Sequence, residues 1–453
     1  MNILISYKLY AITDRTWLRE DETLADAVRH AILGGATIVQ LREKSLEYDK
    51  LKELALSVQK VCKDYNVPFI VNDNVELANE INADGVHLGQ NDMSIKSARS
   101  ILGEGKIIGA TAKTVEQAKA AESEGADYIG SGAVFGTDTK SDATNLSIES
   151  LDEICKSVSI PVVAIGGINA YNASTLRGTS IAGVSVVSGI FARNNKSKAS
   201  RDILSNLYDR PVVECITNHV TTNEVANIVL AFGASPIMAH NINEVAEVQA
   251  GANALLLNLG ATDDYLAMKK AYEVAIRSGH ISVIDPVGVS GITYRRNFLK
   301  ELLRIGSPTC IRGNASEILA IYKGQNTSWG LDGSVAGYDI ADVTLKLARS
   351  LGTIVVASGV TDIISDGNIV TEVASGHMLQ KNLTGSGCML SASICAALAM
   401  GNVNYTSISN KNIVIVENVC LEMGDAACRA AEYVIKEDKG TYSFQTRWFD
   451  ELV

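Results

Sequence analysis

The residues best suited to chemistry lie near the C-terminal end of the chain. Gly385, Ser386 and Gly387 directly precede Cys388, and a stretch rich in small residues follows as far as Met400. Glycines at the start of an expected helix leave backbone N–H groups open, and the helix dipole attracts anions to them. A cysteine in the first turn of a helix also forms a thiolate more readily. Such a turn beside a proton acceptor is typical of a small-molecule kinase, although burial alone would also explain a free cysteine.

Two acidic residues upstream extend this hypothesis. Asp285 ends an apolar run just before a Pro-Val-Gly turn, which places it at the carboxyl edge of an expected sheet. Glu317 stands three residues after Asn314, a suitable N-cap, in the first turn of an expected helix. The two carboxylates can organise Mg²⁺ and water around the phosphates of ATP. The alternative for Glu317 is that it only stabilises the first turn of its helix.

Short apolar runs rich in Val and Ile alternate with longer amphipathic stretches in the first half of the chain. Apolar strands separated by helices are typical of a parallel sheet that is covered on both faces. Eight such units predict a closed (β/α)8 TIM barrel, whereas the alternative, an open doubly wound sheet, normally has fewer strands. The expected strands are 8–13, 37–42, 68–73, 85–89, 106–111, 128–135, 162–168 and 183–190.

Polar residues gather where these strands end, at the rim on which TIM barrels carry their active sites. Asp73 and Asp92 follow consecutive strands, so their carboxylates can face one another. Hard oxygen ligands of this kind suit Mg²⁺, whose shell is completed by substrate phosphates. Arg42, Lys44 and Lys140 at the same rim would then face a diphosphate. The alternative is that Asp73 and Asp92 are only ion-pair partners of these cations.

A second phosphate pocket is expected on the neighbouring part of the rim. Gly167 follows the seventh strand, and Val187 and Ser188 follow the eighth, where TIM barrels frequently bind phosphate. Glycine permits close approach of a backbone N–H, and Ser188 adds a hydroxyl donor. The rim therefore suits one diphosphate with metal and one monophosphate. Expelling a diphosphate needs Mg²⁺ and cations rather than a protein nucleophile.

The regular alternation of apolar runs and amphipathic stretches changes near residues 208–211. We place a boundary there between a domain of residues 1–207 and a domain of residues 208–453. A hairpin is expected around Asp366 and Gly367, and long helices follow to about residue 436. This is the pattern of an open α/β domain finished by helices. The strands expected before the hairpin are 235–238, 254–258, 282–285, 309–312 and 353–357.

The composition excludes several classes of partner. The chain of 453 residues has a formal net charge of −11, which argues against nucleic acid or a membrane surface as a partner. It has no apolar run of about 18 or more residues and no signal-peptide pattern. Its eight cysteines show no CxxC motif, which suits buried thiols in a reducing compartment. We therefore expect a cytoplasmic protein.

The first half of the chain resembles thiamine-phosphate synthase over about residues 5–207. The similar motifs are 9–14 (LYAITD), 40–44 (QLREK), 71–73 (VND), 85–90 (GVHLGQ) and 165–168 (IGGI). The resemblance implies that hydroxymethylpyrimidine diphosphate is joined to hydroxyethylthiazole phosphate, with release of diphosphate and formation of thiamine phosphate. Two departures stand out: Gly136 replaces the usual Pro before the Thr-x-Thr-Lys segment, and Thr111 replaces the commoner Ser.

This resemblance also implies roles for the rim residues, with Asp73 and Asp92 as the ligands of Mg²⁺. The residues that would hold the pyrimidine diphosphate are Gln40, Leu41, Arg42, Glu43, Lys44, Asn72, Thr111 and Lys140. Those that would line the thiazole phosphate side are Thr137, Asp138, Thr139, Gly167, Val187 and Ser188.

The second half, about 209–453, resembles hydroxyethylthiazole kinase of the ribokinase-like superfamily. The similar motifs are 215–218 (CITN), 233–239 (GASPIMA), 285–288 (DPVG), 312–314 (RGN) and 384–388 (TGSGC). The resemblance implies that Cys388 accepts the proton of the thiazole's hydroxyethyl group as that group attacks ATP. Met238 and Gly385 would contact the thiazole, and Arg312 and Ser358 would contact the nucleotide. Kinases of this family are typically trimers, so we expect a trimer or a hexamer.

The two implied reactions are consecutive, which makes a fusion of the two enzymes reasonable. The expected ligands are hydroxyethylthiazole, thiazole phosphate, hydroxymethylpyrimidine diphosphate, ATP and Mg²⁺. Two rivals stay open: the barrel as a phosphate-binding aldolase or isomerase, and the second half as a binding module without turnover, since a free thiol is a weak base at neutral pH. We expect His87, His219 and His377 to be structural.

Overall fold

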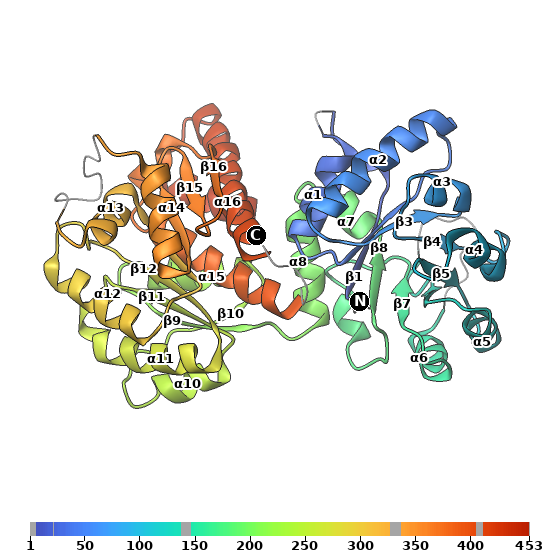
Figure 1. Cartoon of the computed structure of the whole chain (residues 1–453), viewed down its shortest axis with the longest axis horizontal. Helices are drawn as coiled ribbons and strands as arrows, with labels where there is room; N and C mark the ends of the chain where they lie inside the picture. The colour runs from blue at the N-terminus through green and yellow to red at the C-terminus, as the bar shows by residue number, and fades with distance from the viewer. Residues whose placement is uncertain (1–5, 21, 137–145, 327–336, 405–410, 453) are drawn as a thin grey trace. The chain divides into compact units, whose positions relative to one another are not determined.

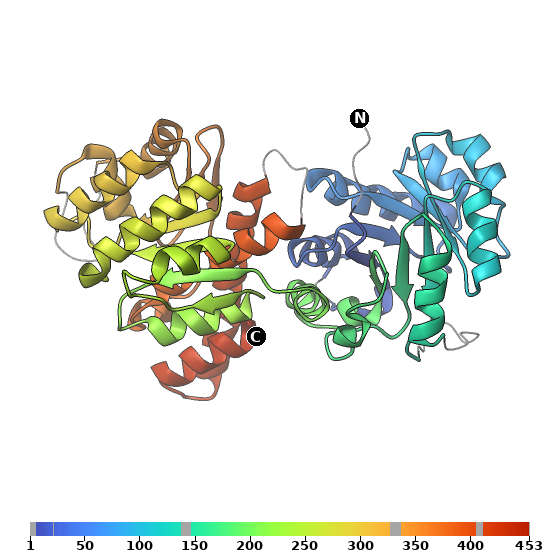
Figure 2. The same cartoon turned by 90° about the horizontal axis from the view of Figure 1, so that it is seen from below.

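The computed structural model describes residues 6–20, 22–136, 146–326, 337–404 and 411–452. The chain divides into two compact units: the main part of the first ends at Asp209, and the main part of the second begins at Arg210. Each unit has its own sheet and its own surrounding helices, as Figures 1 and 2 show.

The first unit is a closed barrel of eight parallel strands, in which β8 pairs with β1 (Figure 1). Every strand lies within the range expected of it, so the predicted TIM barrel is confirmed. The strands are β1 (Leu9–Ile12), β2 (Ile38–Leu41), β3 (Phe69–Asn72), β4 (Gly85–Leu88), β5 (Ile107–Thr111), β6 (Tyr128–Gly132), β7 (Val162–Ile165) and β8 (Gly183–Val186).

Helices cover the outside of the barrel, and most of them begin at a capping side chain. Thr23, Asn74, Ser94, Thr114 and Ser147 each accept a hydrogen bond from a backbone N–H in the first turn of their helix. Two of the loops contain short 3-10 helices, which are η1 (Arg15–Trp17) and η2 (Ala173–Leu176). The α-helices are α1 (Leu24–Leu33), α2 (Tyr48–Asp64), α3 (Val75–Glu80), α4 (Ile95–Leu102), α5 (Val115–Ser123), α6 (Ile148–Ser157), α7 (Ser188–Phe191) and α8 (Lys196–Leu207).

The second unit is built on an eight-stranded sheet in the order β10-β9-β11-β12-β13-β14-β15-β16. The strands from β10 to β14 run parallel, and β15 and β16 continue the sheet antiparallel, as the expected hairpin requires. The strands are β9 (Val212–Ile216), β10 (Ser235–Ile237), β11 (Ala254–Asn258), β12 (Ile281–Asp285), β13 (Cys310–Asn314), β14 (Ile354–Ser358), β15 (Asp362–Ser365) and β16 (Val370–Val373).

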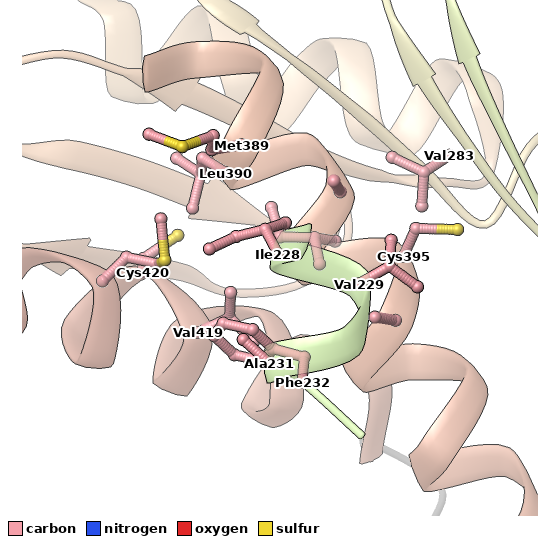
Figure 3. Close-up of a cluster of buried hydrophobic side chains, with 14 of the residues drawn as sticks. Ile228, Val229, Ala231, Phe232, Val283, Met389, Leu390, Cys395, Val419 and Cys420 are labelled. Carbon is pink, nitrogen blue, oxygen red and sulfur yellow. The ribbon is translucent and has the colours of Figure 1, made fainter. Parts of the chain in front are cut away.

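Helices cover both faces of this sheet. Successive residues of each strand point to opposite faces, so each strand contributes to the core on both sides. Val213 and Cys215 point into a core with α9, α15, α16 and α17, whereas Ile216 packs against α11 and α12. Figure 3 shows part of the first core, where α9 lies against the C-terminal helices. The helices are α9 (Thr222–Ala231), α10 (Val245–Gly251), η3 (Thr262–Asp264), α11 (Tyr265–Ser278), α12 (Thr293–Ile305), α13 (Ala315–Lys323), α14 (Ile340–Leu351), η4 (Met378–Asn382), α15 (Ser386–Asn404), α16 (Lys411–Lys436) and α17 (Thr441–Leu452).

Two elements of the second unit were not expected. Strand β9 lies in the interior of the sheet, but Glu214 interrupts its apolar run with a charged residue type. Helix α17 continues the chain beyond the predicted helical end near residue 436 and buries Trp448. Among the described residues, none of the helices combines the length and apolar character needed to cross a membrane.

Candidate active sites

The rim of the barrel brings together the predicted strand-end residues. Gln40, Asn72 and Thr111 lie in or near the last position of β2, β3 and β5, while Asp73 and Asp92 lie in the exposed loops after β3 and β4. The backbone N–H of Asp73 donates to the carbonyl of His87 on β4 at 2.9 Å, which ties the first of these loops to the neighbouring strand. Thr137, Asp138, Thr139 and Lys140 lie outside the described residues.

Three consecutive charged side chains follow β2, of which only Glu43 has an ion-pair partner among the described residues. Glu43 accepts from Arg15 through both oxygens, at 2.7 and 3.0 Å, so its carboxylate holds the loop to η1. The Arg42 and Lys44 side chains, in contrast, make no hydrogen bond or ion pair within the described part of the chain. Within the described residues, neither side chain is therefore an ion-pair partner of Asp73 or Asp92, while Lys140 lies outside those residues. Leu41, between Gln40 and Arg42, is buried.

Asp92 has a local role in the loop that carries it. Its Oδ2 accepts from the backbone N–H of Gly89 at 2.6 Å, which closes a tight turn and fixes the carboxylate after β4. Asp73 adopts a left-handed backbone conformation, with φ +62°. Within the described residues no group of three or more His, Cys, Asp or Glu side chains is arranged to hold a metal. Two carboxylates that leave most of the shell to phosphate oxygens and water fit Mg²⁺.

The loops that are expected to line the thiazole phosphate side pack backbone against backbone. The N–H of Phe135 donates to the carbonyl of Gly166 at 3.0 Å, which joins the loops after β6 and β7. Gly167 has φ +67°, and a Cβ there would come within 2.5 Å of the Gly136 carbonyl oxygen, so only glycine fits. Val187 is the N-cap of the short helix α7, and Ser188 is the first residue of that helix.

A hydrogen-bonded chain inside the barrel was missed by the sequence reasoning. Gln40 Nε2 donates to the Tyr10 hydroxyl at 2.8 Å, and that hydroxyl lies 2.7 Å from the Tyr128 hydroxyl. His87 Nδ1 is 2.9 Å from Tyr128, and His87 Nε2 is 3.0 Å from Thr111 Oγ1. His87 therefore contacts a predicted site residue rather than serving only the core. Aromatic residues in apolar strands look like ordinary core positions, so only topology reveals the chain.

The second site is centred on Cys388, in the first turn of α15. Its Sγ accepts from Asn258 Nδ2 at 3.2 Å and from Asn218 Nδ2 at 3.7 Å. Asn258 ends β11 directly beside Asp285, the last residue of β12. Burial, and then the charge of Asp285, raise the pKa of Cys388 to about 11. The expectation that a first-turn position favours the thiolate is therefore outweighed in the free protein. Neither asparagine was identified from the sequence as a site residue.

Asp285 lies in this site as a buried carboxyl with an open acceptor. Its Oδ2 accepts from Ser391 Oγ at 2.8 Å and lies 3.9 Å from Arg312 Nη1. Its Oδ1 is buried without a hydrogen-bond partner among the described residues, and burial raises the pKa of Asp285. A buried, unpaired carboxylate oxygen at the edge of a sheet fits a bound cation or its water shell.

Glu317 combines a structural contact with a place beside Asp285. Its two oxygens accept from the backbone N–H groups of Gly288 at 2.7 Å and Asn314 at 2.9 Å, and it forms a capping box with Asn314. Burial, and then the charge of Asp285, raise the pKa of Glu317 to about 7. Glu317 thus fixes the turn after Asp285 as well as the start of α13.

The remaining predicted residues surround this centre. Arg312 donates to Ser358 Oγ, and a Cβ at Gly387 would come within 2.4 Å of Arg312 Nη1, so the guanidinium lies against the start of α15. Gly385 has φ +87° and faces Thr221, with room for no side chain. Met238 follows the edge strand β10 and packs against the same hydrophobic core as Cys388.

Comparisons with known proteins identify both halves. The family described as thiamine monophosphate synthase matches residues 9–190, and the hydroxyethylthiazole kinase family matches residues 204–453. A "Probable thiamine biosynthetic bifunctional enzyme" from Schizosaccharomyces pombe is 30% identical, over 97% of this chain and 93% of that protein. The chain belongs to the family of bifunctional thiamine biosynthetic enzymes.

Other relatives agree with this family. The "Thiamine biosynthetic bifunctional enzyme" of Saccharomyces cerevisiae is 33% identical, over 80% of this chain and 77% of that protein. The "Thiamine-phosphate synthase" of Clostridium botulinum is 46% identical, over 44% of this chain and 93% of that protein. Both resemblances seen in the sequence are confirmed, with a thiamine-phosphate synthase and a hydroxyethylthiazole kinase in one chain. A barrel acting as an aldolase or isomerase and a second half without turnover are both wrong for this family.

Proposed function

We propose that this enzyme makes thiamine phosphate in two steps at the two sites described above. Residues 208–453 transfer the γ-phosphoryl group of ATP to 4-methyl-5-(2-hydroxyethyl)thiazole. Residues 1–207 then join the thiazole phosphate to hydroxymethylpyrimidine diphosphate and release diphosphate. The observation that carries the proposal is that Cys388 lies beside Asp285 at the carboxyl edge of one sheet, while Arg42 and Lys44 on a barrel rim of the same chain have no ion-pair partner among the described residues.

In the barrel, departure of the diphosphate is driven by positive charge. Arg42 and Lys44 would bind the phosphates, together with Lys140, and Gln40, Asn72 and Thr111 would help to hold the pyrimidine diphosphate. Asp73 and Asp92 would hold Mg²⁺, which when bound neutralises charge on the leaving group. Leu41 would line the pocket beside Gln40, and Glu43 would act through its ion pair with Arg15.

The acceptor for this reaction is the nitrogen of the thiazole ring. Gly167, Val187 and Ser188 would hold the phosphate of the thiazole through backbone N–H groups and the Ser188 hydroxyl. Thr137, Asp138 and Thr139 would complete this side of the pocket. Once the diphosphate leaves, the pyrimidine methylene carbon loses that bond and forms one to the thiazole nitrogen. No protein nucleophile takes part, because holding the two ligands face to face is sufficient.

In the second unit, Cys388 would accept the proton of the thiazole's hydroxyl group. As the O–H bond breaks, the alcohol oxygen attacks the γ-phosphorus, ADP leaves, and the proton resides on Sγ. The N–H donors of Asn218 and Asn258 stabilise the thiolate that this step requires. Asp285 and Glu317 would hold Mg²⁺ with the phosphates of ATP, which supplies charge neutralisation at the transferred group.

Binding in the second unit would divide between two sides of the start of α15. Met238 and Gly385 would contact the thiazole, and Arg312 and Ser358 would contact the nucleotide. We propose a cytoplasmic homo-oligomer, a trimer or a hexamer, whose mass light scattering would measure. A monomer at the concentration of the assay would refute that part.

One reaction tests the two-step function. The full-length protein is given hydroxyethylthiazole, MgATP and hydroxymethylpyrimidine diphosphate, and thiamine phosphate is measured. We expect product that disappears when ATP is omitted and returns when thiazole phosphate replaces the thiazole. Product only with thiazole phosphate would refute the kinase role, and no product with either would refute the barrel role.

A further inference from the structure

The hydrogen-bonded chain inside the barrel joins two residues that we propose to bind the pyrimidine diphosphate. Gln40 and Thr111 are its ends, and Tyr10, Tyr128 and His87 lie between them. Gln40 comes from β2 and Thr111 from β5, so the chain spans the interior of the barrel beneath the rim. Such a chain has a direction, because each neutral member has a fixed number of hydrogens to donate.

The direction at the first two members follows from Gln40. An amide nitrogen only donates, so Gln40 Nε2 donates to the Tyr10 oxygen. Burial raises the pKa of Tyr10 and of Tyr128, and both phenols therefore keep their protons. Tyr10 is 1% exposed, and among the described residues Tyr128 is the acceptor within reach of its hydroxyl. The hydrogen of Tyr10 is therefore donated to Tyr128, because a buried hydroxyl without an acceptor is costly.

The direction of the hydrogen bond between Tyr128 and His87 follows in the same way. Because its oxygen already receives the hydrogen of Tyr10, its own hydrogen is donated to His87 Nδ1. A neutral imidazole whose Nδ1 accepts carries its proton on Nε2. That Nε2–H group donates to Thr111 Oγ1. The hydroxyl of Thr111 then has its own hydrogen left to donate at the rim.

We propose that Tyr128 is a positioning residue of the synthase. Through this chain it holds His87 as the Nε2–H tautomer, so that the Thr111 hydroxyl is presented as a hydrogen-bond donor to the pyrimidine diphosphate. The inference rests on the proposed ligand role of Thr111. Phosphate oxygens only accept hydrogen bonds, so the orientation matters. If every hydrogen bond in this chain ran in the opposite direction, Thr111 would donate its hydrogen to His87 Nε2. Its hydroxyl could then only accept hydrogen bonds from a ligand.

The tautomer can be measured directly in the full-length protein. Histidine labelled with ¹⁵N at Nδ1 alone is incorporated, and the ¹⁵N shift reports whether that atom carries a proton. The chain has six histidines, and the His87→Gln variant identifies the signal of interest. We expect an unprotonated Nδ1 at His87. A protonated Nδ1 would overturn the proposal, since Gln40 would then present its carbonyl oxygen to Tyr10.

Removal of one hydroxyl tests the role of Tyr128. In Tyr128→Phe, we expect Nδ1 of His87 to become partly protonated and the KM for pyrimidine diphosphate to rise about 3- to 10-fold, with kcat changed less. Tyr7→Phe is the matched control, because the Tyr7 ring lies 5.1 Å from that of Tyr128 but its hydroxyl is outside the chain. Unchanged Nδ1 protonation and KM in Tyr128→Phe would overturn the proposal.

Variants of Thr111 separate this inference from the proposed ligand site. Thr111→Val should raise the same KM about as much as Tyr128→Phe, and Thr111→Ser, which keeps the hydroxyl, should restore it. If Thr111→Val leaves the KM unchanged while His87 has the expected tautomer, the ligand role of Thr111 fails although the chain of hydrogen bonds stands. A wild-type protein without synthase activity from thiazole phosphate would instead refute the proposed function of the barrel.

Discussion

The two sites handle charge in opposite ways. On the barrel rim, Asp73, Asp92 and Lys44 are exposed to solvent, whereas Asp285 and Glu317 in the second unit are only 1% and 3% exposed. Loss of a diphosphate requires positive charge around a highly charged group, which exposed side chains provide at little desolvation cost. Phosphoryl transfer to an alcohol must keep water away from ATP, and a buried site does so at the expense of raised pKa values. The proposed roles of these residues would account for the difference in where the charge lies.

The largest expected effect concerns the buried side of this comparison. Cys388→Ser should lower the kcat of the kinase about 100- to 10,000-fold, because a serine hydroxyl is a far weaker general base. The synthase rate from thiazole phosphate in the same protein should not change. Because the pKa of Cys388 is about 11, the wild-type kinase rate should rise about tenfold per pH unit from pH 7 towards pH 10.

A flat pH profile of the wild-type kinase would break the comparison, since the thiol would then not be the proton acceptor. Alanine at position 388 serves as the control for size, because it removes the sulfur without introducing a hydroxyl.

On the exposed side, Asp92→Asn separates charge from the geometry of the loop. The amide oxygen can still accept from the N–H of Gly89, so the turn is kept while a carboxylate is lost. We expect the kcat of the synthase to fall about 100-fold or more, the cost of removing one group that stabilises transition-state charge. The Mg²⁺ concentration that gives half of the maximal rate should be higher than for the wild type.

The matched control is Asp64→Asn, an exposed carboxylate at the end of α2, which should leave the synthase unchanged. Equal activity of Asp92→Asn and wild type would remove Asp92 from the metal site.

The salt dependence of the two KM values should also distinguish the two sites, with a smaller effect than the substitutions above. Exposed charges are screened by ions, whereas buried groups are screened much less. Raising KCl from about 0.05 M to 0.5 M should increase the KM for pyrimidine diphosphate severalfold. The KM for the uncharged thiazole, measured at saturating MgATP, should stay nearly constant. A salt-sensitive thiazole KM would show that the second site is open to solvent.

The smallest effect is on stability. Glu214 in β9 is buried, both of its oxygens lack a partner among the described residues, and burial raises its pKa to about 8. The folded protein holds this proton more tightly than the unfolded chain, so stability should fall as pH rises from about 4.5 towards 8. Glu214→Gln should flatten this slope in the melting temperature of the second unit.

Glu372→Gln, on the exposed edge strand β16, is the control and should leave the slope unchanged. Identical slopes for Glu214→Gln and wild type would show that Glu214 ionises freely in the folded state.

The barrel was predictable because its strands are short apolar runs and its polar residues follow them. Strand β9 was missed because Glu214 interrupts its apolar pattern, and burial of an ionisable group cannot be read from one sequence. Cys388 and Asp285 could be proposed from the sequence because each stands beside glycine or proline at the boundary of an element. Asn258 ends a strand without such a signal, and its bond to Cys388 spans 130 residues. Its role depends on the order of strands, which sequence pattern does not specify.

The two halves also differ in when their cores can form. The barrel closes when β8 pairs with β1, so all of its strands precede residue 187. In the second unit, Val213 of β9 belongs to the same core as Trp448 and Leu452 of α17. A ribosome therefore completes the barrel early, while the core around the first strand of the kinase is complete only once the last helix has been made. A premature stop codon near the end would leave the synthase intact and turn the rest of the chain into a target for chaperones and proteases.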